Sequence, residues 1–108
     1  MISHYFSSTP PRLFAHRGFS ARFPETTLPA FCAALQAGAV YLEMDVWASR
    51  DGKVMVHHDE TLYRMCGRFR RIRNLTFEEI KACDAGWGFR EKGGERPFKG
   101  RGITVPSL

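Results

Sequence analysis

The alternation of apolar and polar positions predicts that the chain starts with a strand, a helix and a second strand. An apolar run over residues 13–16 indicates a short strand, and the polar segment 17–26 indicates a loop. Helical spacing then predicts a helix from about Thr27 to Gly38, with proline tolerated in its first turn. The run 40–48 is apolar almost throughout, which is typical of a strand buried on both faces. The helix positions expected to pack in the core are Leu28, Phe31, Cys32, Leu35 and Ala39.

A hairpin and a short helix are predicted after the second strand. Asp51-Gly52 favours a tight turn, so that residues 53–57 are expected to pair back on the strand before them. A plain β-α-β succession would pass directly to a helix, and residues 49–102 are therefore interpreted as an insertion. Within it, Thr76 followed by Glu79 is the capping-box pattern and predicts a short helix that starts there.

Two carboxylates on the second strand are a strong chemical signal. Glu43 and Asp45 are two residues apart, so their side chains are expected on the same face of the strand. Within an apolar run such a pair costs free energy unless something neutralises it. Carboxylate oxygens suit a hard cation such as Mg²⁺ or Ca²⁺, whereas zinc sites usually show thiolates or several imidazoles. The alternative is a partly exposed strand with solvated or salt-bridged acids.

Histidines and an arginine stand at the ends of the other apolar runs. His16 ends the first strand, and Arg17 beside it offers a planar fork of donors suited to phosphate oxygens. His57 and His58 are adjacent, so strand geometry directs them to opposite faces and only one can line a site. Asp59 is placed to orient a histidine. Structural hydrogen bonding and turn chemistry are the alternatives for these residues.

Together, these segments resemble the glycerophosphodiester phosphodiesterase family. The resemblance covers about residues 12–108 and implies an α/β fold, the N-terminal part of a (β/α)₈ TIM-type barrel with an inserted hairpin and short-helix subdomain. It also implies hydrolysis of glycerophosphodiesters to glycerol 3-phosphate and an alcohol, with a divalent cation, Mg²⁺ or Ca²⁺. The motifs that carry it are Ala15-His16-Arg17-Gly18, Pro24-Glu25-Thr26-Thr27-Leu28, Leu42-Glu43-Met44-Asp45-Val46, Asp51-Gly52 and Val56-His57-His58-Asp59 with Thr61-Leu62.

The resemblance also implies a role for each site residue. His16 and His58 match the general acid/base pair of the family, and Arg17 matches its phosphate-binding arginine. Glu43 and Asp45 match two of its metal ligands. The third metal-binding carboxylate of the family lies on a later strand than those found here.

Two further residues have supporting roles in this interpretation, and two motifs depart from the family pattern. Glu25 matches the glutamate of the family's Pro-Glu-Asn-Thr motif, and Asp59 is the other candidate for support of the site. Thr26 replaces the asparagine of that motif. After Leu62, Tyr63-Arg64-Met65-Cys66 replaces the usual Asp-Arg-Thr-Thr, and we expect this to alter substrate-side loop contacts without touching the catalytic set.

The length of 108 residues suits one small core, whereas a (β/α)₈ barrel needs about 250 residues. We therefore expect residues 13–108 to be the N-terminal portion of the barrel domain, with the remainder absent and the chain inactive by itself. Residues 1–12 are expected to be a flexible lead-in. The chain ends where a helix is expected to start, with Ser107 as its cap. A complete small domain is the alternative.

Composition favours a soluble cytoplasmic protein. Of the residues, 44% are apolar and 25% charged, and no apolar run approaches the ~20 residues of a membrane span. The first residues lack the basic leader and apolar core of a secretory signal. Three cysteines far apart in the sequence suit reduced thiols, which favours the cytoplasm.

The net charge of +5 has to be explained, and two functions other than catalysis are considered. A cluster of arginines between residues 64 and 73 suits either a solvated hairpin or attraction of anionic diesters or lipid head groups. It would also suit a basic nucleic-acid-binding module, although we expect no nucleic-acid partner. A non-catalytic truncated remnant is the second alternative. The favoured hypothesis is an enzyme of glycerophospholipid metabolism that acts on small-molecule diesters, and the oligomeric state stays open.

Overall fold

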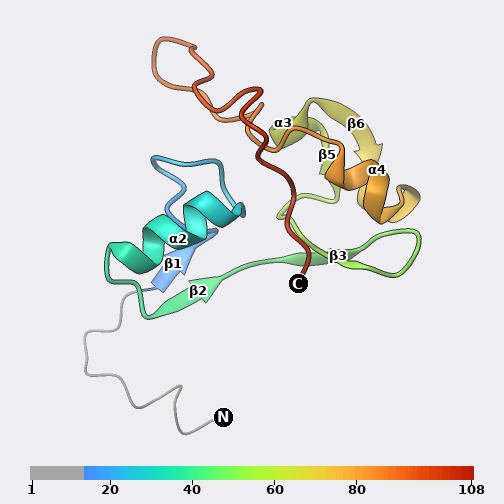
Figure 1. The fold of residues 1–108 in the computed structure, drawn as a ribbon, viewed down its shortest axis with the longest axis horizontal. Coiled ribbons are helices and arrows are strands. Elements are labelled where there is room, and N and C mark those ends of the chain that lie inside the picture. The colour runs from blue at the N-terminus through green and yellow to red at the C-terminus, as the bar shows by residue number, and fades with distance from the viewer. Residues whose placement is uncertain (1–13) are drawn as a thin grey trace, which may run out of the picture.

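The computed structural model describes residues 14–108 and begins with the predicted β-α-β unit. Strand β1 (Phe14–His16) pairs in parallel with β2 (Tyr41–Glu43). Helix α2 (Leu28–Gln36) connects the two strands (Figure 1). The expected lead-in, residues 1–12, lies outside the described residues.

Helix α2 packs on the loop before it through small side chains. Gly18 approaches the helix so closely that an added Cβ would lie 2.8 Å from the backbone carbon of Ala30, and its φ of +81° also favours glycine. Of the predicted core positions, Phe31 is buried, but Leu28 and Leu35 are more than half exposed. The prediction of the buried face of this helix from its helical spacing is therefore wrong for most of these positions. The buried side chains of α2 are those of Ala30, Phe31 and Ala34.

The apolar run 40–48 does not form the single buried strand that its composition predicts. The chain leaves β1 after Glu43, and β3 (Val46–Ala48) pairs in a different sheet. Val40 and Val46 are 46% and 47% exposed. Within residues 14–108, β2 has one neighbouring strand, so its other edge and part of its faces are uncovered. An apolar run reports which residues prefer burial but cannot report which neighbours are present to bury them.

The hairpin predicted from Asp51-Gly52 is present. Strand β3 pairs antiparallel with β4 (Val54–Val56), and Gly52 has the positive φ (+82°) that a tight turn requires. The Asp51 carboxylate accepts hydrogen bonds from the Ser49 hydroxyl at 2.6 Å and from the Phe77 amide at 2.9 Å. The turn is therefore tied to the start of a helix far along the chain.

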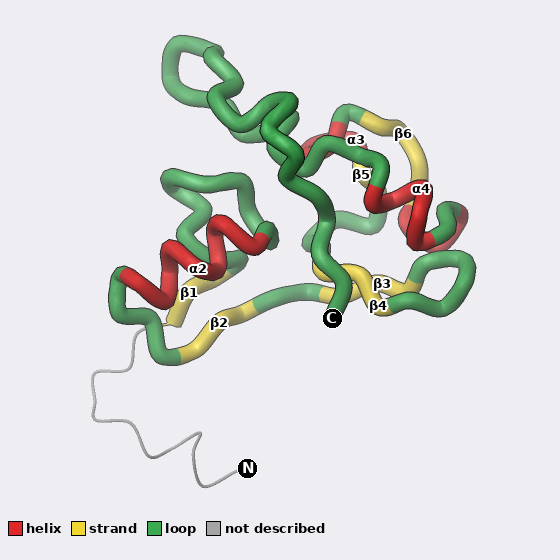
Figure 2. The backbone as a smooth tube through the Cα atoms, in the orientation of Figure 1, coloured by secondary structure: helices red, strands yellow, loops and turns green. Residues whose placement is uncertain are grey.

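A second antiparallel pair and short helical segments follow. Strand β5 (Thr61–Leu62) pairs with β6 (Arg68–Arg71), and the short helix α3 (Tyr63–Cys66) connects them. The chain continues through the 3₁₀ helix η1 (Ile72–Asn74) into α4 (Phe77–Lys81) (Figure 2). Loops make up much of the remaining path, as the tube in Figure 2 shows.

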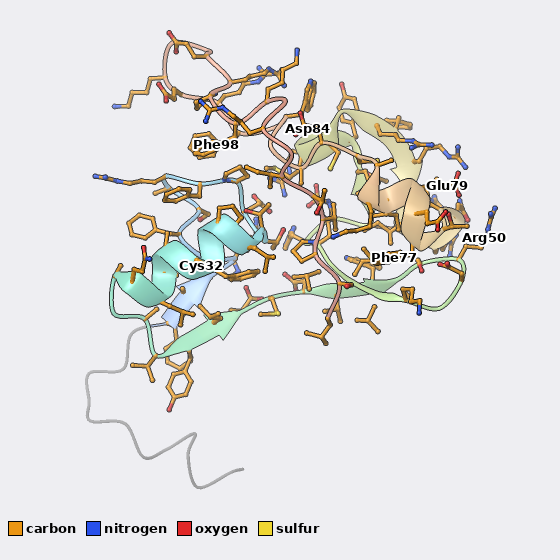
Figure 3. All side chains as sticks on the ribbon, viewed as in Figure 1. Cys32, Arg50, Phe77, Glu79, Asp84 and Phe98 are labelled. Carbon is orange, nitrogen blue, oxygen red and sulfur yellow. The ribbon has the colours of Figure 1, made fainter. Side chains whose placement is uncertain are left out.

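Helix α4 starts with the predicted capping box. The Thr76 side chain accepts from the Glu79 amide at 3.2 Å, and the Glu79 carboxylate accepts from the Thr76 amide at 2.9 Å. Arg50 of the hairpin turn lies 3.7 Å from Glu79, and the two side chains lie close together in Figure 3. The exposed Arg50–Glu79 ion pair therefore joins α4 to the hairpin, together with the hydrogen bond that the Phe77 amide donates to Asp51.

The hydrophobic core of the described chain lies between this hairpin, η1 and α4. The last residues pack on it from the side of β4, because Val56 donates to Pro106 O at 2.8 Å and Met55 forms an antiparallel bridge with Ser107. Ser107 therefore lies in extended pairing, which is also the backbone conformation of an N-cap residue, so the helix expected to start there stays a prediction. The core side chains are those of Met55, Leu62, Ile72, Leu75, Ile80, Cys83, Ala85 and Val105.

Aromatic rings connect the loop 17–26 with the glycine-rich segment 86–102. The ring of Phe23 lies 5.6 Å from that of Phe98, which in turn lies 5.2 Å from Phe89. Phe98 is labelled in Figure 3. Such ring pairs stabilise by about 0.5 to 1.5 kcal/mol beyond their buried area. None of the helices in residues 14–108 is both long enough and apolar enough to span a membrane.

Candidate active site

The parallel pairing of β1 and β2 brings the first two candidate residues together. The register places His16 opposite Glu43, and His16 Nε2 lies 3.2 Å from Glu43 Oε2. The Arg17 amide donates to Glu43 O at 3.0 Å, which continues the pairing by one residue. Arg17 is thereby fixed at the carboxyl ends of both strands, next to His16.

The loop after β1 has two non-glycine residues in the left-handed region. Arg17 has a φ of 60° and Thr26 a φ of 54°. The Thr26 amide donates to Arg17 O at 2.9 Å, so these two residues close the loop on itself. Closure brings Glu25 back to Arg17, whose Nη1 lies 3.3 Å from Glu25 Oε2.

His58 lies between an acid and an arginine, and both partners define its tautomer. Its Nδ1 is 2.7 Å from Asp59 Oδ1, and its Nε2 is 2.8 Å from Arg17 Nη2. An ionised carboxylate only accepts and a guanidinium only donates. Nδ1 therefore carries the proton and Nε2 presents a lone pair, which is the arrangement of a neutral imidazole.

Arg64 on α3 completes this group. Its guanidinium donates to both oxygens of Glu25 at 2.8 Å and to those of Asp59 at 2.9 and 3.0 Å. We call Arg17, Glu25, His58, Asp59 and Arg64 the charge cluster. Arg64 was missed by the sequence analysis, and the expectation that the change after Leu62 leaves the catalytic set untouched stays a prediction. The signal available was that arginine is kept in Tyr63-Arg64-Met65-Cys66 where the family's other three residues are replaced.

Hydrogen bonds within the charge cluster shift the pKa values of its acids. The hydrogen bonds from Arg64 hold the pKa of Asp59 far below its usual range, with a further contribution from His58. Burial by itself raises the pKa of Glu25, but the hydrogen bonds and charges of Arg64 and Arg17 outweigh it and the pKa is lowered. The hydrogen bonds that Arg64 donates to Glu25 and Asp59 raise its own pKa. Both acids are therefore ionised at neutral pH.

His57 forms no side-chain hydrogen bond with the charge cluster among the described residues. Its side chain is buried, its amide donates to Asp45 O at 3.0 Å, and its Nε2 is buried without a hydrogen-bond partner. Burial lowers the pKa of His57, which favours the neutral imidazole. The two adjacent histidines thus have different environments, and the structure brings His58 to Arg17.

The predicted metal ligands Glu43 and Asp45 each have an unsatisfied oxygen. Glu43 Oε2 and Asp45 Oδ2 are buried and accept no hydrogen bond from the described residues, because the contact of Glu43 with His16 lacks hydrogen-bond geometry. Buried carboxylate oxygens without partners are costly, and a hard cation satisfies them. Within residues 14–108, however, no three His, Cys, Asp or Glu side chains gather closely enough to form a cation site.

Comparison with known proteins shows to which family the chain belongs. Residues 16–108 match the Glycerophosphoryl diester phosphodiesterase family. The chain belongs to this family. The resemblance noted in the sequence is therefore confirmed, and the α/β fold corresponds to part of the family's TIM-type barrel.

Individual relatives show how much of the family domain is represented. The chain is 39% identical over 97 residues to a glycerophosphodiester phosphodiesterase of Bacillus altitudinis, covering 90% of this chain and 37% of that protein. The crystal structure of the enzyme from Agrobacterium tumefaciens matches with a TM-score of 0.79 and 39% identity, covering 90% of this chain and 39% of the other. An Oleispira antarctica phosphodiesterase, solved with the product sn-glycerol-3-phosphate, matches with a TM-score of 0.78 and 33% identity, covering 91% of this chain and 37% of that one. The chain thus spans less than two fifths of the length of these relatives.

Replacing Thr26 by asparagine should stabilise the chain. A left-handed φ costs an L-residue about 1 to 2 kcal/mol, and asparagine tolerates it better than a β-branched side chain. We expect Thr26→Asn to raise the free energy of urea unfolding by about 1 kcal/mol. Thr27→Asn is the matched control, since Thr27 is equally buried but has a φ of −112°, and it should bring no such gain. A loss of stability in Thr26→Asn would show that the threonine hydroxyl outweighs the backbone preference.

Acidification should destabilise the chain through Asp59 and Glu25. Both have a lowered pKa in the folded state, so their contribution is complete above unfolded pKa values of about 4 and is lost as pH falls through the lower folded values. The free energy of urea unfolding should therefore decrease from about pH 6 to pH 3, and less steeply in Asp59→Asn. Glu91→Gln, at an exposed glutamate, should keep the wild-type slope. Identical slopes in all three proteins would contradict the ionic role of Asp59.

Proposed function

We propose that the protein carrying this chain hydrolyses glycerophosphodiesters to glycerol 3-phosphate and an alcohol, with the help of a divalent cation. The observation that carries this proposal is the meeting of Arg17 with His58 at the strand end where His16 faces Glu43. Membership of the family supports it, as does the product found in the Oleispira antarctica relative. The substrate is thus a small-molecule diester.

Arg17 is the proposed phosphate ligand. Its Nη atoms contact Glu25 and His58, whereas its Nε is buried and has no hydrogen-bond partner among the described residues. A buried donor without an acceptor is costly, and a phosphoryl oxygen would satisfy it. The family position of Arg17 and this vacant donor support the same role.

His16 and His58 are the proposed proton-transfer pair. The lone pair on His58 Nε2 accepts from Arg17 in this structure and would accept a proton once the substrate phosphate engages Arg17, while Asp59 holds the ring in that tautomer. One histidine takes a proton from the nucleophile, and the other gives one to the leaving alcohol. The nucleophile is either water or the glycerol hydroxyl of the substrate, and the same two side chains serve both routes.

Glu43 and Asp45 are the proposed protein ligands of Mg²⁺ or Ca²⁺. Their unsatisfied buried oxygens fit a hard cation, which takes six or more oxygen ligands in all. When bound, the cation would offset negative charge that develops on the phosphoryl oxygens. The remaining ligands would come from water, substrate and residues outside this chain.

The setting of this activity is proposed to be glycerophospholipid metabolism in the cytoplasm. Cys32, Cys66 and Cys83 are all free thiols, as a reducing compartment favours. Burial raises the pKa of the Cys66 thiol to about 12, so this cysteine suits packing rather than reactivity. The basic segment is partly neutralised, because Arg71 lies 3.4 Å from Glu60 and Arg64 lies in the charge cluster. We therefore propose no nucleic-acid partner.

Removal of either proposed acid/base histidine should abolish most of the activity of the full-length enzyme. His16→Ala and His58→Ala should each lower kcat by about 10² to 10⁴, the usual contribution of a positioned proton donor or acceptor. His57→Ala is the matched control and should stay within a fewfold of wild type, because His57 is buried and it is His58 that contacts Arg17. The measurement is release of glycerol 3-phosphate below the unfolding temperature of each variant. Equal losses at His57 and His58 would contradict the assignment.

Neutralising the proposed cation ligands should weaken metal binding and activity together. Glu43→Gln and Asp45→Asn keep the size of each side chain but remove the charge that hard cations prefer. Calorimetric titration with Mg²⁺ and Ca²⁺ should show lower affinity in both variants, while Glu78→Gln on α4 should bind as wild type does. Full activity of both variants in excess EDTA would overturn the metal assignment.

Residues 1–108 alone are proposed not to turn over substrate. The described part supplies two carboxylates to the cation, and β2 has one neighbouring strand to hold it. Release of glycerol 3-phosphate from glycerophosphocholine by the purified chain, with Mg²⁺ or Ca²⁺, should not exceed that of its His16→Ala variant. Turnover above that blank from a monodisperse sample would show that these residues suffice for the reaction.

A further inference from the structure

We infer that Arg64 is a positioning residue that holds Arg17 and His58 in place by bridging Glu25 and Asp59. Its four hydrogen bonds of 2.8 to 3.0 Å divide equally between the two acids. Each acid in turn contacts one residue of the proposed site, Glu25 with Arg17 and Asp59 with His58. The consequence for catalysis rests on the proposed function, whereas the bridge itself does not.

The charges of the bridge explain why two arginines are needed. Arg17 and Arg64 balance Glu25 and Asp59, and Glu25 is only 11% exposed, so it is poorly stabilised by water. Without Arg64, Arg17 would be the remaining cation in contact with Glu25 among the described residues. Glu25 would then compete with the phosphate of the substrate for the Arg17 guanidinium. By neutralising Glu25, Arg64 thus leaves the Arg17 guanidinium available to the phosphate of the substrate.

The geometry of the bridge also fixes His58. Asp59 Oδ1 accepts from both His58 Nδ1 and Arg64 Nη2, so the carboxylate that orients the imidazole is itself held by a fork of two donors. A lysine would supply the charge of Arg64 as a single ammonium, which does not reproduce a planar fork donating to two carboxylates. Charge and geometry can therefore be separated by substitution.

Arg64 is well placed for such a test. Its side chain is 46% exposed, and the adjacent Met65, rather than Arg64, is buried in the fold. Substitution therefore removes the bridge without opening a cavity. Arg70 on β6 is a matched control, because it is an exposed arginine of the same segment and has no acidic partner among residues 14–108.

The first measurement is the NMR titration of His58 in the 108-residue chain. The charged groups that face it are Arg17 from the loop after β1, its neighbour Asp59 and, through them, Glu25 and Arg64, with neutral His57 beside it. Loss of Arg64 removes a cation and leaves two acids less compensated, which favours the protonated imidazole. Arg64→Ala should have a higher titration midpoint of His58 than the wild-type chain measured beside it. Arg64→Lys and Arg70→Ala should stay near wild type.

The second measurement is steady-state kinetics of the full-length enzyme. Loss of an outer partner of a site residue typically costs about 10- to 100-fold, so Arg64→Ala should lose that much kcat/KM, with KM raised because Glu25 retains Arg17. Arg64→Lys should still lose about tenfold, and Arg70→Ala should lose nothing. Adding Glu25→Gln to Arg64→Ala should bring KM back toward wild type.

The two measurements distinguish failure of this inference from failure of the proposed function. An unchanged His58 midpoint in Arg64→Ala, or wild-type kcat/KM in Arg64→Ala, would overturn the positioning role. Absence of diesterase activity in the wild-type protein would overturn the proposed function, and the His58 titration would then decide on the bridge alone. If Arg64→Ala does not fold, the neutral and longer Arg64→Gln takes its place in both measurements, with the same expectations.

Discussion

Compensation of two half-buried acids by two arginines is the interaction on which the rest of this site depends. Glu25 comes from the loop before α2, and Asp59 follows β4, so the acids belong to different parts of the chain. Arg64 reaches both from α3. The charge cluster therefore joins the β-α-β unit to the segment that follows it, and the same bonds that orient His58 hold these two parts together.

Those features that depend on neighbours in the sequence were predictable. Thr76 and Glu79 are three residues apart, and their reciprocal hydrogen bonds need nothing beyond the first turn of α4. The turn at Asp51-Gly52 is predictable in the same way, since a tight turn needs a residue with positive φ and Gly52 supplies it. The strand ends that place His16 and Glu43 opposite each other follow from the order of strand, helix and strand. Local chemistry decides each of these cases.

Features that depend on distant partners were not predictable. Arg64 and Glu25 are 39 residues apart, and no periodicity indicates that their side chains meet. Leu28 has the helical spacing of a core residue, yet it is exposed. The helix instead packs on the loop through Ala30, because Gly18 and Ala30 are both small enough for a close approach. The division of residues 40–48 between two sheets likewise depends on which strands are available to pair. In each case the residue types indicated what kind of contact to expect, but the sequence did not indicate which residues would form it.

The aromatic contacts between Phe23, Phe98 and Phe89 have a consequence for how this family member can vary. Surface excursions usually tolerate insertions and deletions, because few contacts cross from them to the rest of a protein. Here the glycine-rich segment 86–102 touches the same loop that presents Arg17 and Glu25. A change in its length would move Phe98 away from Phe23 and release that loop, so evolution of the outer segment is constrained by the loop that carries Arg17 and Glu25.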